Sequence, residues 1–157
     1  MAFKQEKLAL DAVIPALRAN NHKQVYQEIC KISGYATRIN PAQIFDKLMM
    51  HEREETSGIG DGVAIPHITI NGLHKPYMLF ARLEKAIDFD AVDGHPVDLL
   101  FLILSPEDDG PYHLRRLSTI SRMFRDKQLR LNLRGTQDTD TLHSLLLDPE
   151  FRSLAAA

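Results

Sequence analysis

The sequence is poor in the features that mark secreted, metal-bound or membrane-inserted proteins. Its 157 residues include one cysteine, Cys30, which excludes an internal disulfide and a cysteine-based metal cluster. The longest apolar run, Leu99–Leu104, is far shorter than the roughly 20 residues of a membrane helix, and Met1–Lys7 lacks the apolar run of a signal peptide. The formal net charge of -2 gives no global field that would attract nucleic acid. We therefore expect a cytoplasmic protein that neither inserts into a membrane nor binds nucleic acid.

What is present is the composition of one soluble domain. Apolar residues make up 44% and charged residues 25% of the chain, which is close to the average for globular proteins. The length fits a single domain over residues 1–157. Strand-like and helix-like segments alternate along the chain, which predicts an α/β fold. We expect a three-layer α/β/α sandwich with a mixed sheet of about five strands.

Caps and apolar periodicity predict four strands and four helices. Pro15 places the first strand at a sheet edge, because proline cannot donate a ladder hydrogen bond. Asn21 and Asn40 are candidate helix caps, with Gln24 and Gln43 three residues further on. The unbroken apolar character of the last strand is typical of a central strand covered on both faces. We expect strands over 12–17, 63–65, 77–83 and 97–104, and helices from 21 to about 34, from 40 to about 55, from 110 and from 138.

The C-terminal third is basic. The helix from residue 110 is expected to bury Leu114, Leu117 and Phe124 on one face. The basic residues between Arg115 and Arg134 are interpreted as a solvated helix face, or alternatively as a docking patch for an acidic partner. The tail 155–157 is expected to be frayed.

A glycine-rich segment, Ser57–Gly62, is the first candidate for binding chemistry. Gly58, Gly60 and Gly62 permit strained backbone, which lets main-chain N–H groups approach an anion. The segment is not a Walker loop, because no Lys-Ser or Lys-Thr follows, and its spacing is not that of the dinucleotide fingerprint. A phosphate cradle and an ordinary tight connection both remain open.

A histidine at the end of a strand is the second candidate. His67 follows Pro66, which restricts the backbone just before it. A neutral imidazole has a free ring nitrogen that can act as a nucleophile, although a structural role is the alternative. His113 stands at the start of a helix, where anions are favoured. The other histidines form no metal-binding pattern, so we expect no metal: His22, His51, His74, His95 and His143.

The segment Arg53–His67 resembles a family signature. An arginine near a helix end and the run S-G-I-G-D-G-V-A-I-P-H are similar to the enzyme IIA domains of the bacterial phosphoenolpyruvate-dependent phosphotransferase system, fructose/mannitol superfamily. The stretch Ile87–Phe101, together with His113-Leu114 and Leu117-Ser118, resembles the nitrogen-regulatory branch. The resemblance covers roughly residues 10–148.

The resemblance implies a phosphorylation site. His67 would carry a phosphoryl group on Nε2, with His113 as the second histidine and Arg53 as a supporting cation. The amides of the segment 57–62 would complete the phosphate site, at Ser57, Gly58, Gly60 and Gly62. The chain has Ser57 where the family often has threonine and Asp61 where it often has asparagine. No metal, nucleotide or other cofactor is implied.

The resemblance also implies partners. The donor would be an HPr-like phosphocarrier protein of the NPr type, and we expect an exposed apolar docking patch made by Ile59, Val63, Ile65 and Ile68. The chain would then regulate nitrogen or potassium metabolism through targets such as potassium transporters or sensor kinases. A fructose- or mannitol-type enzyme that passes phosphate to a sugar-specific IIB remains open. So do a non-catalytic binding regulator and, last, a metal-dependent hydrolase.

Overall fold

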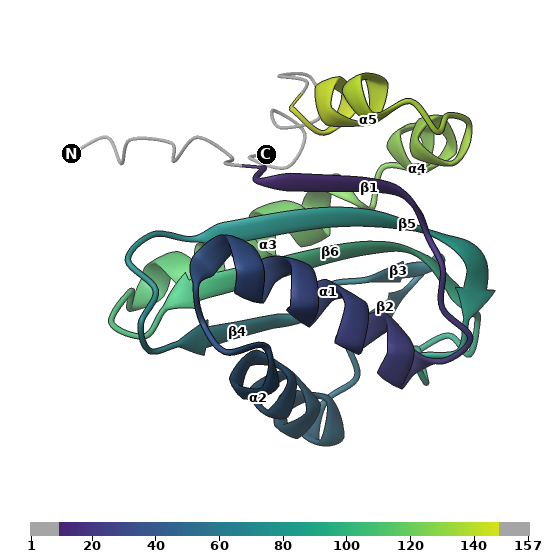
Figure 1. Cartoon of the computed structure of the whole chain (residues 1–157). Coiled ribbons are helices and arrows are strands. Elements are labelled where there is room, and N and C mark those ends of the chain that lie inside the picture. Colours follow the sequence, from purple (N-terminus) through teal and green to yellow (C-terminus); the bar gives the residue numbers. More distant parts are fainter. Residues whose placement is uncertain (1–9, 148–157) are drawn as a thin grey trace.

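One mixed sheet organises the chain. The computed structural model describes residues 10–147, so the expected domain ends at 1 and 157 and the expected frayed tail lie outside the described residues. The described strands run in the order β1–β5–β6–β3–β2, and β4 also pairs with β6 (Figure 1). The sheet therefore has six strands where about five were expected. The strands are β1 (Ala12–Leu17), β2 (Gly58–Gly60), β3 (Val63–Ala64), β4 (His67–Ile70), β5 (Tyr77–Ile87) and β6 (Val97–Pro106).

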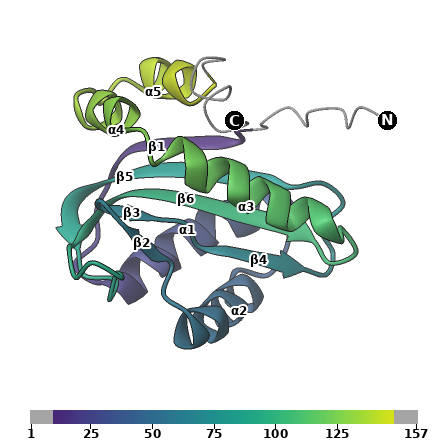
Figure 2. The same cartoon turned by 180° about the vertical axis from the view of Figure 1, so that it is seen from behind.

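The helices lie on both faces of this sheet. α1 and α2 cover one face and α3 crosses the other (Figures 1 and 2). The sheet has a hydrophobic core on each face, and buried residues from α3, α4 and α5 belong to the core on the face opposite α1 and α2. The predicted three-layer α/β/α sandwich is confirmed. The helices are α1 (His22–Thr37), α2 (Pro41–Glu54), α3 (Pro111–Met123), α4 (Lys127–Arg134) and α5 (Thr139–Leu146).

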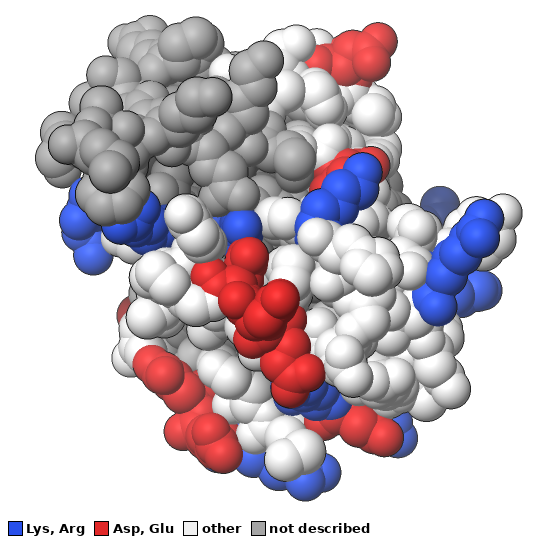
Figure 3. Space-filling model, turned by 90° about the vertical axis from the view of Figure 1, so that its left-hand side faces the viewer, with Lys and Arg blue, Asp and Glu red and all other residues white. Residues whose placement is uncertain are grey.

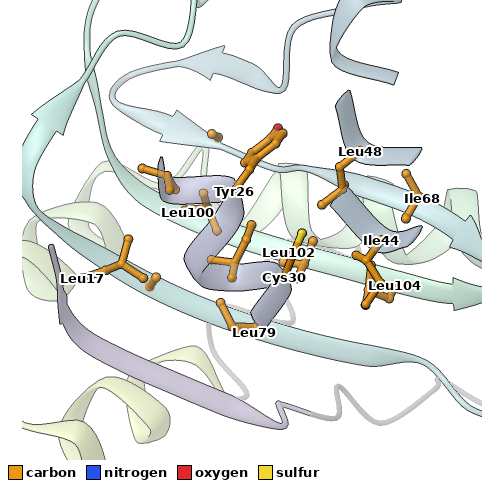
Figure 4. Packing of buried hydrophobic residues seen from close by; sticks show 14 of the residues in the cluster. Leu17, Tyr26, Cys30, Ile44, Leu48, Ile68, Leu79, Leu100, Leu102 and Leu104 are labelled. Atoms are coloured by element: carbon orange, nitrogen blue, oxygen red, sulfur yellow. The ribbon is translucent and has the colours of Figure 1, made fainter. Parts of the chain in front are cut away.

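β6 is the central strand, as its apolar run predicted. It is parallel to β3 and β4 and antiparallel to β5. Because side chains alternate along a strand, Leu100 and Leu102 enter the core under α1 and α2, whereas Phe101 and Ile103 enter the other core. Figure 4 shows Tyr26 of α1 near the leucines of β6. The strand is thus covered on both faces, and it fixes where the chain enters α3.

The predicted caps begin their helices, but the predicted end of α1 is wrong. The side chain of Asn21 accepts a hydrogen bond from the Gln24 amide at 2.9 Å, and Asn40 caps α2. α1 continues through Gly34 to Thr37. A Cβ at Gly34 would lie 2.7 Å from Cγ of Pro41, so this glycine permits close packing of the two helices instead of ending the first.

The segment before His67 also differs from expectation. The predicted glycine loop contains β2, which forms an antiparallel hairpin with β3. The predicted strand over 63–65 was expected to end at His67, but β3 ends at Ala64 and His67 opens β4. Pro66 lies between the two strands, and its missing N–H interrupts the ladder. His67 is therefore placed by its own pairing with Ile103 of β6.

The C-terminal helices correct two further expectations. Leu114 was expected to be buried, but 65% of it is exposed, whereas Phe124 is buried. The basic run is divided between α3 and a short helix that was not predicted, α4, which begins at a cap formed by Asp126. Leu129 and Leu133 are fully buried. α4 was difficult to predict because it is only eight residues long and largely polar, so that Leu129 and Leu133 were the main indication of a buried helix face.

Candidate functional site

Three histidine rings meet at the start of β4. Nδ1 of His67 lies 3.0 Å from Nε2 of His113, which is a hydrogen bond between residues 46 positions apart. The ring of His51, from the last turn of α2, packs edge-on against His67 with centroids 4.6 Å apart. The structure therefore brings His67 and His113 together, as the sequence led us to expect, and adds His51, which sequence reasoning missed.

A buried polar network lies behind His113. Its Nδ1 is 2.7 Å from Oγ of Ser105, near the C-terminal end of β6. Arg116, one turn along α3, donates to the same oxygen at 2.9 Å and also forms an ion pair with Asp109. His113, Ser105 and Arg116 are all less than 9% exposed. Neither Ser105 nor Arg116 was expected here, because one ends an apolar strand and the other belongs to a run of arginines.

Burial favours the neutral form of His67 and of His113. It lowers the pKa of His67 from 6.5 to about 4, with smaller effects of the same sign from His51 and His113. Burial also lowers the pKa of His113, followed by the nearby charge of Arg116 and by His51, while Asp109 opposes them. A neutral imidazole has one donor and one acceptor nitrogen. Since Nδ1 of His67 faces His113, Nε2 is the nitrogen left for an incoming group.

Among the described residues, no hydrogen bond or ion pair joins Arg53 to His67. The side chain of Arg53 is exposed and lines a separate hollow of about 460 Å³ with residues that include Lys23 and Phe45. Positions two apart on a helix are separated by about 200° around its axis, so Arg53 and His51 face different ways. The ring beside His67 belongs to His51, whereas the resemblance implied Arg53 as the supporting cation.

The glycine hairpin uses its polar groups internally. The hydroxyl and amide of Ser57 both bond to the carboxylate of Glu52, and Tyr26 approaches the same hydroxyl at 3.0 Å. The amide of Gly58 donates to Thr56. A Cβ at Gly58 would lie 2.8 Å from Cβ of Ala91. This end of the expected phosphate cradle is thus occupied by packing and by hydrogen bonds within the protein.

The turn of the hairpin lies away from His67. On β6, His67 pairs with Ile103 and Val63 pairs with Leu99, a separation of four residues or about 13 Å along the strand. Gly60 and Gly62 lie beyond that point, where both have positive φ. The structure gives the hairpin a packing role and does not support the expected phosphate cradle.

Asp61 belongs to the same turn. Its amide donates to the carboxylate of Asp93 at 2.9 Å, and its carbonyl accepts from Arg134 at 2.6 Å. Arg134 also forms an ion pair with Asp98. Asp61 therefore takes part in a charged cluster at the end of the sheet remote from His67, where its negative charge does not oppose a phosphoryl group.

The expected apolar docking patch is wrong in three of four residues. Val63, Ile65 and Ile68 are at most 3% exposed, because they belong to the two cores, and only Ile59 is exposed at 41%. The large exposed apolar side chains next to the site in sequence are Met50, Tyr112 and Leu114. They flank His51 and His113 on α2 and α3.

The surface charge is mixed. Figure 3 shows acidic and basic side chains together with wide uncharged areas on one face, and neither sign dominates it. The basic run is also not one solvated face, since Arg116 is buried and Arg130 donates to the carbonyls of Phe124 and Arg125. Among the described residues, no group of three or more His, Cys, Asp or Glu side chains could hold a metal ion. No helix within residues 10–147 is long and apolar enough to span a membrane.

Comparison with known proteins places the chain in a family. The family model of the phosphoenolpyruvate-dependent sugar phosphotransferase system, EIIA 2, matches residues 6–148. A nitrogen regulatory protein of Bradyrhizobium diazoefficiens is 41% identical over 142 residues, which cover 90% of this chain and 93% of that protein. A fructose-specific EIIA component of Haloferax volcanii is 39% identical over 103 residues, with coverages of 66% and 67%.

A solved structure agrees with these sequence matches. The nitrogen regulatory protein IIA-Ntr of Neisseria meningitidis superimposes with a TM-score of 0.78 at 28% identity, and the match covers 92% of each chain. Its fold and its sequence both resemble this chain. The chain therefore belongs to the EIIA 2 family of the phosphoenolpyruvate-dependent sugar phosphotransferase system.

Proposed function

We propose that the chain is a phosphocarrier that accepts a phosphoryl group on Nε2 of His67 from an HPr-like protein of the NPr type. The observation that carries the proposal is the 3.0 Å contact between Nδ1 of His67 and Nε2 of His113. It turns Nε2 away from the protein network, and the low pKa of His67 keeps the ring neutral near pH 7. A neutral ring is the form that can act as a nucleophile.

The chemistry needs positioning more than covalent assistance. The Nε2–P bond would form as the N–P bond of the partner's phosphohistidine breaks. The ring proton of His67 would pass to solvent, and the partner's nitrogen would gain one from solvent. His113 orients the accepting ring, while the neighbouring ring of His51 supplies a second imidazole near the anionic group. The donor already carries an activated phosphoryl group, so the proposal calls for no nucleotide or metal.

We further propose that the phosphorylation state is the output of the protein. Support comes from relatives that bear the name nitrogen regulatory protein. In this proposal the two states of His67 differ in affinity for target proteins, such as potassium transporters or sensor kinases, in the cytoplasm. Met50, Tyr112 and Leu114 would lie at the edge of such a contact, since they are exposed beside the site.

A fructose-type enzyme IIA is the second candidate, because the Haloferax relative bears that name. It would pass the phosphoryl group to a sugar-specific IIB. Transfer from phosphorylated protein to a purified fructose IIB separates the candidates: rapid discharge would favour the sugar enzyme, and stable label would favour the regulator.

The first test is phosphoryl transfer from labelled phosphoenolpyruvate through enzyme I and an HPr-like carrier. We expect acid-labile, base-stable label on wild type and none on His67→Ala. His74→Ala is the matched control, because His74 is an exposed histidine in a loop outside the site. Absence of label on wild type with an active carrier would contradict the proposal and favour a non-catalytic binding regulator.

A further inference from the structure

A buried hydrogen-bond network of Ser105 and Arg116 lies behind His113, and packing a helix on a strand does not require it. Ser105 lies between His113 and Arg116, with separations of 2.7 Å and 2.9 Å from its hydroxyl oxygen. Ser105 is fully buried, and Arg116 is 6% exposed. Burying a cation and a hydroxyl is costly unless each has partners. The network has those partners, and it leads directly to the ring that contacts His67.

The direction of the hydrogen bonds follows from Arg116. A guanidinium group has only donors and remains charged, so the oxygen of Ser105 accepts from Arg116. The hydroxyl proton of Ser105 then points to Nδ1 of His113. Because burial and the charge of Arg116 keep the pKa of His113 low, the neutral ring carries its proton on Nε2 and donates it to Nδ1 of His67.

The opposite direction is less favourable. A proton on Nδ1 of His113 would make the oxygen of Ser105 accept two N–H groups, one of them from a cation. The hydroxyl proton would then have no acceptor among the hydrogen bonds that Ser105 makes within the described residues. A buried hydroxyl without an acceptor is costly. The chain of donors therefore runs from Arg116 towards His67.

We propose that Ser105 and Arg116 are positioning residues that act through His113 to keep a hydrogen-bond donor on Nδ1 of His67, and thereby stabilise the Nε2-phosphorylated state. This inference rests on the proposed function. A neutral imidazole substituted on Nε2 has its lone pair on Nδ1, so the same donor fits before and after phosphorylation. Nε2 attacks only through a free lone pair, so its proton passes to solvent as the Nε2–P bond forms, and the partner's released nitrogen gains a proton as the old N–P bond breaks.

The first experiment reads the proton positions without any phosphorylation. Long-range ¹H–¹⁵N spectra assign the tautomers of His67 and His113 in the dephosphorylated protein. We expect the proton on Nε2 of both rings in wild type and a mixture in Ser105→Ala. Ser33→Ala is the matched control, because the hydroxyl of Ser33 is also buried but bonds to the carbonyl of Ile29. An Nδ1 proton on His67 in wild type would overturn the inference.

The second experiment measures how long the phosphoryl group stays on the protein. Each protein is phosphorylated through enzyme I and the HPr-like carrier, freed of the carrier, and followed by loss of label at pH 7.5. Loss of one hydrogen bond in the chain corresponds to a half-life about threefold to tenfold shorter in Ser105→Ala and in Arg116→Met. Arg116→Lys, which keeps a cation and a donor, is expected to recover part of the lifetime.

The rate of acceptance separates positioning from general damage. We expect Ser105→Ala to accept the phosphoryl group at least as fast as wild type, because a mixture of tautomers leaves the Nε2 lone pair of His67 free in part of the molecules. The exposed Arg125 provides the surface control Arg125→Met. Half-lives equal to wild type in both Ser105→Ala and Arg116→Met would overturn the inference. If wild type accepts no label, the proposed function fails. The tautomer spectra still decide whether the hydrogen bonds from Arg116 through Ser105 fix the proton positions on His113 and His67.

Discussion

The titration of His67 is the quantity that most directly tests the site. Burial, with His51 and His113 nearby, lowers its pKa from 6.5 to about 4. A shift from 6.5 to 4 corresponds to roughly 3 kcal/mol in favour of the neutral ring. At pH 5 such a ring is about 90% neutral, whereas a histidine of ordinary pKa is about 3% neutral. Near pH 5 the two cases therefore differ about thirtyfold in the fraction of His67 rings that are neutral and can act as a nucleophile.

The same shift predicts the pH dependence of stability. Between pH 4 and 6.5 the unfolded chain binds a proton at His67 that the folded chain does not bind, so the free energy of unfolding rises with pH in this window. The contribution is fully present above 6.5 and is lost as the pH falls to about 4. We expect His67→Gln, which cannot titrate, to lose less stability than wild type over this range in urea unfolding.

Two assays decide the matter. An NMR titration follows the ring of His67 in wild type and in His51→Gln, and phosphoryl acceptance is measured from pH 5 to 8 with the carrier in excess. We expect a midpoint near 4, a higher midpoint in His51→Gln, and nearly constant acceptance. A midpoint at or above 6.5, or a fall in acceptance of about thirtyfold at pH 5, would refute the reasoning.

Three further substitutions test the neighbourhood. Gly62→Ala should destabilise the protein by about 1–3 kcal/mol in urea unfolding, because Gly62 has a φ of +77° and a Cβ there would lie 2.4 Å from Arg134. Arg53→Ala should leave acceptance unchanged and stability within about 0.5 kcal/mol, because its side chain is exposed away from His67; a tenfold loss of acceptance would return it to the site. His51→Gln should raise the pKa of His67 above about 4, because His51 is one of the groups that lower it; an unchanged midpoint in the NMR titration would contradict this.

Much of the fold could be predicted because its signals are local. Asn21 and Asn40 begin helices by capping, which depends on a residue type and its close neighbours. The end of α1 was predicted wrongly because glycine often ends a helix, whereas Gly34 lies inside α1 and allows close contact with Pro41. That contact depends on how two helices pack, which no short window of sequence contains. β2 was missed for a similar reason, since three residues carry no periodicity.

The site was harder to predict from local pattern. His67 and His113 were assigned from the family resemblance, and their hydrogen bond joins β4 to α3. Ser105 and Arg116 carry no pattern of their own, because their role arises only when the end of β6 meets the first turns of α3. The choice between Arg53 and His51 depended on the rotation of α2. A shift of two residues around a helix reverses which side chain faces the site.

That rotation changes how the site can balance charge. With Arg53 turned away, the rings in contact with His67 among the described residues belong to His51 and His113. A phosphoryl group would bring negative charge to a half-buried position and favour protonation of a neighbouring ring. Arg116 opposes protonation of His113. The permanent cation connected to His67 is then Arg116, through Ser105 and His113.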